Sequence, residues 1–206
     1  MPLPTSTILR MFTPQLLDRH PFSAFTSIPV SECDFKKVHS EAEYYRPNAV
    51  YVNESKNYID ENEALRTTRS FHVSAGGEVL RELHEEILID AVSELIARPV
   101  FPTRSSYIYY LSNDFLAPHN DVQQCQVTLL LPLTSPSRLL IYPDIDTSNP
   151  DAVFEKFITG TLDGEIEISL IESHALLFNG RRIVHARRKN DREERTVTLC
   201  YGFDDE

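Results

Sequence analysis

The chain has 206 residues and a formal net charge of −11, with 41% hydrophobic and 25% charged residues. This length fits one large domain, and the composition supports a buried core and argues against intrinsic disorder. A chain this acidic lacks the basic face that binds phosphate backbones. Nucleic acid is therefore excluded as an expected partner.

The sequence contains no apolar run of about 18 residues, so we expect no membrane span and no membrane partner. The first ten residues lack the charged-then-apolar pattern of a signal peptide, which favours a cytoplasmic protein. The three cysteines, Cys33, Cys125 and Cys200, lie far apart without Cys-x-x-Cys spacing. In a reducing compartment such a sparse set predicts free thiols, so no disulfide is expected.

The first half of the chain is predicted to be helical and irregular. Thr13 and Pro14 indicate the start of a short helix, as N-cap residue and first helical position. The clearest helix follows Gly76 and Gly77, because apolar residues then recur at spacings of three and four until Pro99. We expect its single apolar face to pack against the outside of a sheet.

From about residue 100 the apolar residues alternate with polar ones, which is typical of short β-strands. The segment 143–150, rich in Asp, Asn and Pro, is predicted to be a loop. The pattern predicts a β-sandwich or barrel in a single domain, 1–206, with a helical support at 1–99 and a β core at 100–203. The predicted strands are 106–111, 124–133, 138–142, 165–170, 175–178, 182–186 and 195–203.

Three histidines have an acidic residue two positions later, but two of these pairs are poor metal ligands. Side chains at i and i+2 of a helix point about 200° apart, so His84 and Glu86 are predicted to form a solvated helix face. His39 and Glu41 lie in a charged stretch without an apolar framework. We expect this second pair at the surface.

His119 and Asp121 form the third pair, in a turn or extended segment between two predicted strands. Side chains at i and i+2 of an extended chain face the same way, so both can reach one metal ion. His185 ends an apolar strand and is the strongest candidate for a third ligand. Two imidazoles and one carboxylate suit non-heme Fe(II) and oxygen chemistry. The alternative is that the three residues are unrelated surface or core groups.

Arg195 opens the last predicted strand, on the same face as Val197 and Tyr201. A guanidinium on an apolar face needs a partner, because burying an unpaired charge is costly. A bidentate clamp on a small dicarboxylate would meet that need. Pairing with Glu193, Glu194 or solvent is the alternative.

Together these residues resemble the Fe(II)- and 2-oxoglutarate-dependent dioxygenase superfamily, in the style of its prolyl-4-hydroxylase-like branch. The resemblance implies a mainly β, α+β fold: a double-stranded β-helix, or jelly roll, buttressed by N-terminal helices. It implies that His119, Asp121 and His185 hold Fe(II), with 2-oxoglutarate as cosubstrate and O2 as oxidant. The segments that carry it are 110–121, 127–133, 175–185 and 195–199.

The resemblance also assigns groups around the cosubstrate. Arg195 would pair with the distal carboxylate of 2-oxoglutarate, and Tyr110 would donate its hydroxyl to the same carboxylate, with Tyr107 and Tyr109 as alternatives. Glutamates 193 and 194 replace a glycine that often precedes the arginine, and Val197 replaces a second hydroxyl. These departures from the family pattern weaken the assignment of the cosubstrate-binding residues more than that of the metal ligands.

The implied reaction releases succinate and CO2. Because the acidic charge balance disfavours nucleic acid, we expect the substrate to be a small polar metabolite, such as an amino acid or natural-product intermediate. Asp121 favours hydroxylation over halogenation, while desaturation, cyclisation and epoxidation use the same ligands. The alternatives are a prolyl-type peptide or protein hydroxylase and a non-catalytic jelly-roll module that binds a metal or ligand. No oligomeric state follows from the sequence.

Basic residues gather near the proposed site. Residues 181–195 carry seven basic and three acidic side chains, a local charge of +4, so the rest of the chain carries −15. Such a basic region suits the attraction of a small dianion. Although each arginine alone is more typical of a solvated surface charge, the candidates for holding a substrate carboxylate are Arg66, Arg69, Arg181 and Arg187.

Overall fold

The structure, a computed structural model, describes residues 25–189 and 191–204, so the predicted helix at Thr13 lies outside the described residues. The helices are α2 (Glu32–Tyr45), α3 (Glu78–Glu82), α4 (Ile89–Ile96) and α5 (Pro150–Thr159), with a 3-10 turn at Arg46–Asn48 and a π-helical turn at Leu83–Ile87. The strands are β1 (Thr26–Pro29), β2 (Val50–Glu54), β3 (Tyr58–Ile59), β4 (Leu65–Arg66), β5 (Arg69–Ser74), β6 (Phe101–Tyr110), β7 (Phe115–His119), β8 (Val127–Pro132), β9 (Ser137–Tyr142), β10 (Ile166–Leu170), β11 (His174–Phe178), β12 (Val184–Arg187) and β13 (Glu194–Gly202).

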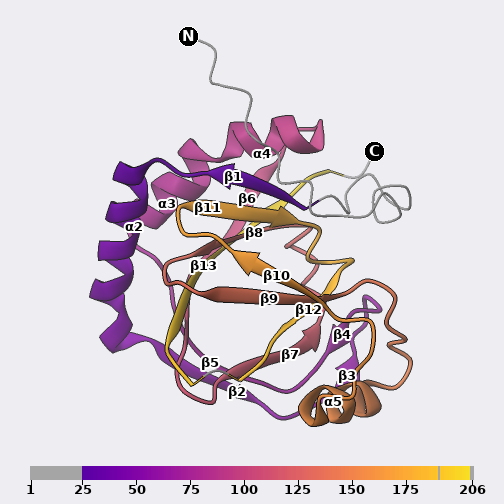
Figure 1. Cartoon of the computed structure of the whole chain (residues 1–206). Coiled ribbons are helices and arrows are strands. Elements are labelled where there is room, and N and C mark those ends of the chain that lie inside the picture. The colour runs from indigo at the N-terminus through magenta and orange to yellow at the C-terminus, as the bar shows by residue number, and fades with distance from the viewer. Residues whose placement is uncertain (1–24, 190, 205–206) are drawn as a thin grey trace.

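Eleven strands form one curled antiparallel sheet, and β3 and β4 form a separate hairpin (Figure 1). Four strands, β11-β8-β13-β6, make one wall, and four others, β7-β12-β9-β10, make the facing wall. Strand β5 pairs with both β6 and β7 and so joins the two walls. This arrangement confirms the predicted double-stranded β-helix. Strands β1, β2 and β5 also belong to the sheet, although no strand is predicted before residue 100.

Side-chain alternation divides each strand between an outer and an inner face. On β13, Val197, Leu199 and Tyr201 face outward into the core shared with α2, α3 and α4, which cover this wall as Figure 1 shows. On the same strand, Thr198 and Cys200 face the interior between the walls. The helices thus cover the outer face of this wall, while its inner face lines a cavity.

The long helix predicted after Gly77 is present but interrupted by the π-helical turn. There the Leu88 amide donates to the carbonyl of Leu83, 3.1 Å away, rather than to His84. The His84 carbonyl instead accepts a hydrogen bond from the Tyr201 hydroxyl at 2.9 Å. The His84 side chain is only 3% exposed, and its Nε2 lies 2.9 Å from the Cys200 carbonyl. The prediction of a solvated face was therefore wrong for His84, because the wider turn directs this residue against the sheet.

Helix α2 occupies the charged stretch that was predicted to lack an apolar framework. Val38 and Ala42, four positions apart, are fully buried against the sheet. Glu41 accepts hydrogen bonds from backbone amides at the start of α3 and from the Tyr107 hydroxyl at 2.8 Å. The surface prediction was therefore wrong for Glu41, whose carboxylate satisfies otherwise unpaired amides of a helix N-terminus.

The cysteine prediction was also wrong. Cys125 and Cys200 form a disulfide between the segment before β8 and the end of β13, across a sequence separation of 75. Cys200 pairs in register with Thr128 on β8, so sheet formation brings the two sulfurs together. Cys33 is free, as predicted, and its side chain is exposed.

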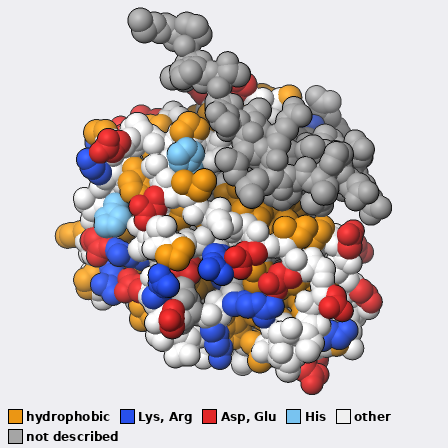
Figure 2. All heavy atoms as spheres, viewed as in Figure 1, with side chains coloured by type: hydrophobic (Ala, Val, Ile, Leu, Met, Phe, Trp, Pro, Cys, Tyr) orange, Lys and Arg blue, Asp and Glu red, His pale blue; other side chains and the backbone are white. Residues whose placement is uncertain are grey.

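The predicted loop at 143–150 is present through residue 149, where Asn149 caps the unpredicted helix α5. Val153 and Phe157 of this helix pack on the outer face of the second wall. No helix in the described part of the chain has the length and apolar character that crossing a bilayer requires. Figure 2 shows basic and acidic side chains interspersed over the lower half of the face viewed in Figure 1.

Candidate metal centre

His119 and His185 are opposed across the pairing of β7 with β12. The Nδ1 atom of His119 lies 3.0 Å from the His185 carbonyl, and that of His185 lies 2.9 Å from the Ile183 carbonyl. Because a carbonyl can only accept, both rings carry their proton on Nδ1. In the neutral form of each ring, Nε2 therefore carries the lone pair, which is the tautomer and orientation that metal-binding histidines adopt.

Asp121 completes a convergent group of three donors. Its Oδ1 atom lies 3.6 Å from Nε2 of each histidine, and the ligand atoms of the group all lie within 4.8 Å of one another. The Asp121 amide donates to the Gly180 carbonyl at 2.9 Å, which fixes the turn after β7. The structure thus brings together His119, Asp121 and His185.

Gly180 allows the carboxylate to approach. A Cβ atom at this position would overlap Oδ2 of Asp121 and crowd Oγ1 of Thr128. Thr128 in turn donates its hydroxyl to Oδ2 at 2.6 Å, so the other oxygen is left for a ligand. The backbone at Gly180 and the side chain of Thr128 therefore both fix the position of Asp121.

Burial and the contacts among the three candidate ligands shift the pKa values of Asp121 and His119. Burial raises the pKa of Asp121, but the adjacent His185 and His119 outweigh it and hold the pKa well below its usual range. Burial, followed by the neighbouring His185, lowers the pKa of His119 to about 4. At neutral pH the site therefore offers an ionised carboxylate beside a neutral His119 imidazole, which is the protonation that cation binding requires.

At the level of sequence, no family model and no curated protein matches the chain. Solved structures do match. The non-heme alpha ketoglutarate dependent epimerase SnoN from nogalamycin biosynthesis is 15% identical over 91% of this chain and 81% of its own, with a TM-score of 0.62. HygX from Streptomyces hygroscopicus, solved with nickel, 2-oxoglutarate and hygromycin B, is 12% identical over 93% of this chain and 87% of its own, with a TM-score of 0.62. A prolyl hydroxylase from Trichoplax adhaerens, in complex with a hypoxia inducible factor peptide, is 16% identical over 90% of this chain and 86% of its own, with a TM-score of 0.58.

The chain has the fold of 2-oxoglutarate-dependent oxygenases. At such low identity the likeness concerns the fold, whereas the His-Asp-His group is an observation on this chain's own side chains. The donor set itself fits a metal ion that keeps open coordination positions, since two imidazoles and one carboxylate meet on one side of it.

Thr128→Val tests whether the hydroxyl positions Asp121 for a cation. We expect affinity for Ni(II), used as a redox-stable probe, to fall about 10-fold, because groups that orient metal ligands contribute about 10- to 100-fold in affinity. Isothermal titration calorimetry measures the change. Thr198→Val is the control, because Thr198 lines the same cavity on β13 without hydrogen-bonding Asp121. Equal affinities in the two variants would contradict the role of Thr128.

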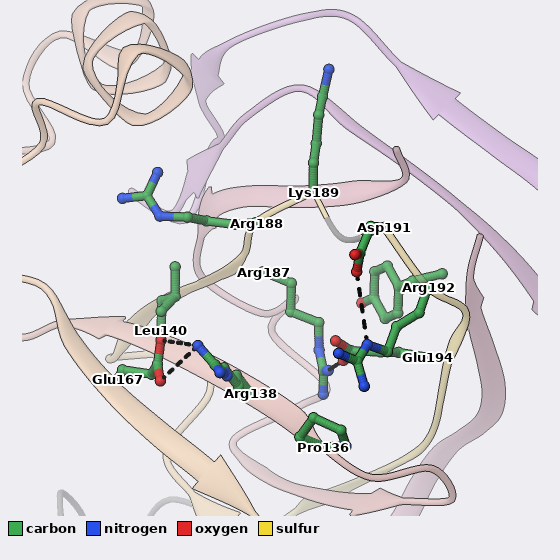
Figure 3. Close-up of a pocket in the computed structure, with 11 residues that line it drawn as sticks. Pro136, Arg138, Leu140, Glu167, Arg187, Arg188, Lys189, Asp191, Arg192 and Glu194 are labelled. Carbon is green, nitrogen blue, oxygen red and sulfur yellow. Dashed lines mark hydrogen bonds and ion pairs between the residues drawn. The ribbon is translucent and has the colours of Figure 1, made fainter. Parts of the chain in front are cut away.

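Two cavities meet beside the His-Asp-His group. An inner cavity of about 100 Å³ is lined by the three candidate ligands and by several arginines, and an outer cavity of about 340 Å³ opens next to it. Tyr110 and Arg187 line both cavities, and Figure 3 shows Arg187 among the residues around the outer one. These two residues therefore lie where the two cavities adjoin.

The arginines proposed for the substrate have different positions. Arg66 and Arg69 line the inner cavity, and each already has an acidic partner: Asp60 at 2.6 Å and Glu54 at 2.7 Å, respectively. Arg187 is 5% exposed and pairs with Glu194 at 2.8 Å. Arg181 lines neither cavity. The structure therefore brings three of the four to the site.

Arg195 does not join the site. It lies, as predicted, on the face of β13 that carries Val197 and Tyr201, but this face is packed against the helices. Its guanidinium forms ion pairs with Glu43 of α2 and with Glu193. The physical reason is that side chains alternate along β13, so the first residue directed to the interior is Glu194 and Arg195 is directed to the opposite face.

Of the three candidate tyrosines, only Tyr110 lines the cavities. Tyr107 and Tyr109 belong to the core under the helices. Sequence reasoning missed Thr128 and Gly180 as supports of Asp121. Thr128 stands in an apolar strand and could have been noticed as a buried hydroxyl, but no local pattern connects Gly180 to Asp121.

Proposed function

We propose that this protein is an Fe(II)- and 2-oxoglutarate-dependent oxygenase that acts on a small molecule. The observation that carries the proposal is the convergence of His119, Asp121 and His185, with both Nε2 atoms directed at one carboxylate oxygen. This group lies inside a fold that proteins with this chemistry share. His119, Asp121 and His185 would hold the iron, which supplies activation of O2 and binding of the 2-oxo acid when present.

The remaining residues shape the surroundings of the metal. The two walls bury the candidate ligands almost completely, since His119 is 6% and His185 3% exposed. Burial raises the pKa of Tyr110 to about 12, so its hydroxyl stays protonated as a hydrogen-bond donor at neutral pH. We propose Tyr110 as a donor to the cosubstrate carboxylate, because it lines both cavities.

Anaerobic titration with Fe(II) and 2-oxoglutarate tests the proposal. We expect a visible metal-to-ligand charge-transfer band in the wild-type protein, because chelation by a 2-oxo acid needs the open positions that three protein ligands leave. The band should disappear in His119→Ala and persist in the matched control His39→Ala, since His39 lies on α2 away from the site. If the wild-type protein shows neither the band nor 2-oxoglutarate-dependent succinate release, the proposed function is wrong.

The substrate we propose is a small polar metabolite, in line with neighbours such as HygX that bind small molecules. A prolyl-type peptide hydroxylase is the second candidate, because the Trichoplax neighbour binds a peptide. Succinate release above the uncoupled rate, screened against metabolites and proline-containing peptides, separates the two. Stimulation by peptides alone would reject the small-molecule proposal. A site that binds metal without succinate release would instead indicate a non-catalytic binding module.

A further inference from the structure

Arg187 has an unusual position at the junction of the inner and outer cavities. It lies two residues after His185 on β12, and both side chains line the inner cavity. Its guanidinium sits over the Tyr110 ring, 5.1 Å from the ring centre. With 5% of its surface exposed, this is a charged group held almost entirely inside the protein.

Of the two terminal nitrogens of the Arg187 guanidinium, only Nη1 has hydrogen-bond acceptors within the described protein. Nη1 donates to Ser137 and to Glu194, both at 2.8 Å. Nη2 is buried and makes no hydrogen bond with the described residues. A buried donor without an acceptor is costly, so this arrangement favours a ligand that brings one. Glu194 and Ser137 meanwhile fix the direction in which Nη2 can donate.

Basic residues outnumber acidic residues around the outer cavity. Five basic and three acidic residues line it. In Figure 3, Arg187 and Arg192 point toward each other, while Arg188 and Lys189 point away from the cavity. The three acidic residues are paired with Arg138, Arg187 and Arg192. The positive excess is therefore contributed by Arg188 and Lys189 at the rim, where cationic side chains raise the local concentration of anions.

Arg195 cannot serve the same purpose from its position. It lies on the opposite face of β13 and is paired with Glu43 and Glu193. Arg187 instead shares the inner cavity with His119, Asp121 and His185. A dicarboxylate bound to a metal at one end could therefore meet Arg187 with the other.

We propose that Arg187 of β12, rather than Arg195 of β13, binds the distal carboxylate of 2-oxoglutarate through Nη2. This inference rests on the proposed function and assigns the residue that selects the cosubstrate. Glu194 is then a positioning residue, because it holds the guanidinium without touching the ligand.

The test compares two 2-oxo acids on the Ni(II)-loaded protein by isothermal titration calorimetry, a measurement of binding rather than activity. 2-Oxopentanoate has the same five-carbon chain as 2-oxoglutarate, with a methyl group in place of the distal carboxylate. We expect the wild-type protein to prefer 2-oxoglutarate about 10- to 100-fold, the range of a charge-assisted hydrogen bond. In Arg187→Met/Glu194→Gln the preference should fall to about 1-fold, and the double substitution avoids leaving Glu194 buried without its partner.

Two single variants sharpen the result. Glu194→Gln should keep or increase the preference, because Arg187 retains its charge and loses its internal counter-ion. Arg195→Met should leave the preference unchanged. Loss of the preference in Arg195→Met, its survival in the double variant, or its absence from the wild-type protein would each overturn the inference. Failure of the Ni(II)-loaded wild-type protein to bind either acid would instead reject the proposed function.

Discussion

Asp121→Ala should weaken Ni(II) binding by at least about 100-fold, because the change removes the one anionic donor of the site. Loss of a group that merely orients a metal ligand lowers metal affinity about 10- to 100-fold, and loss of the ligand itself has a larger effect. Cation binding to the folded state stabilises it by RT ln(1 + [L]/Kd). At a Ni(II) concentration 100 times the wild-type Kd, this stabilisation is about 2.7 kcal/mol for the wild-type protein and about 0.4 kcal/mol for a variant bound 100-fold more weakly.

Guanidinium unfolding with and without Ni(II) measures this difference. In the absence of metal, Asp121→Ala should unfold at a denaturant concentration close to that of the wild-type protein, because the substitution also removes a buried charge that folding must desolvate. His39→Ala is the control that keeps the full stabilisation by Ni(II). An Asp121→Ala variant that Ni(II) still stabilises by more than about 2 kcal/mol would show that Asp121 is not a ligand.

The candidate metal ligands could be found from sequence because their geometry is largely local. An extended chain fixes the relative direction of His119 and Asp121, and alternation gives His185 a defined face on its strand. Only the pairing of β7 with β12, which opposes the two histidines, needed the structure. The double-stranded β-helix followed from the same segments through the resemblance they carry.

The position of Arg195 could not be predicted, for a reason that alternation makes clear. The pattern correctly groups Arg195 with Val197 and Tyr201, but it does not say whether that face is turned toward the helices or toward the interior. The sequence did contain a pattern that indicates Arg187: it lies two positions after His185, and residues two apart on a strand are expected to share a face. Identifying which face of the last strand is interior required the packing of α2 to α4, and the signals for α2 were only Val38 and Ala42 in a charged segment.

Removing the disulfide in Cys125→Ala/Cys200→Ala should give the largest loss of stability outside the metal site. The bond closes a loop across a sequence separation of 75. A cross-link of that length restricts the unfolded chain by up to about 4.5 kcal/mol. We therefore expect a clear decrease in the denaturant midpoint in guanidinium unfolding, and no comparable change in Cys33→Ser, because Cys33 is exposed and unpaired.

Thiol titration of the unreduced protein checks the bond itself. One reactive thiol per chain is expected when the protein is unfolded without reductant, and three after reduction, since the sequence contains three cysteines. Because none of the candidate metal ligands is changed, stabilisation by Ni(II) should persist in the double variant. Loss of stability with retained Ni(II) binding would show that the disulfide stabilises the wall without being needed for metal binding. Three reactive thiols in the unreduced protein would contradict the disulfide.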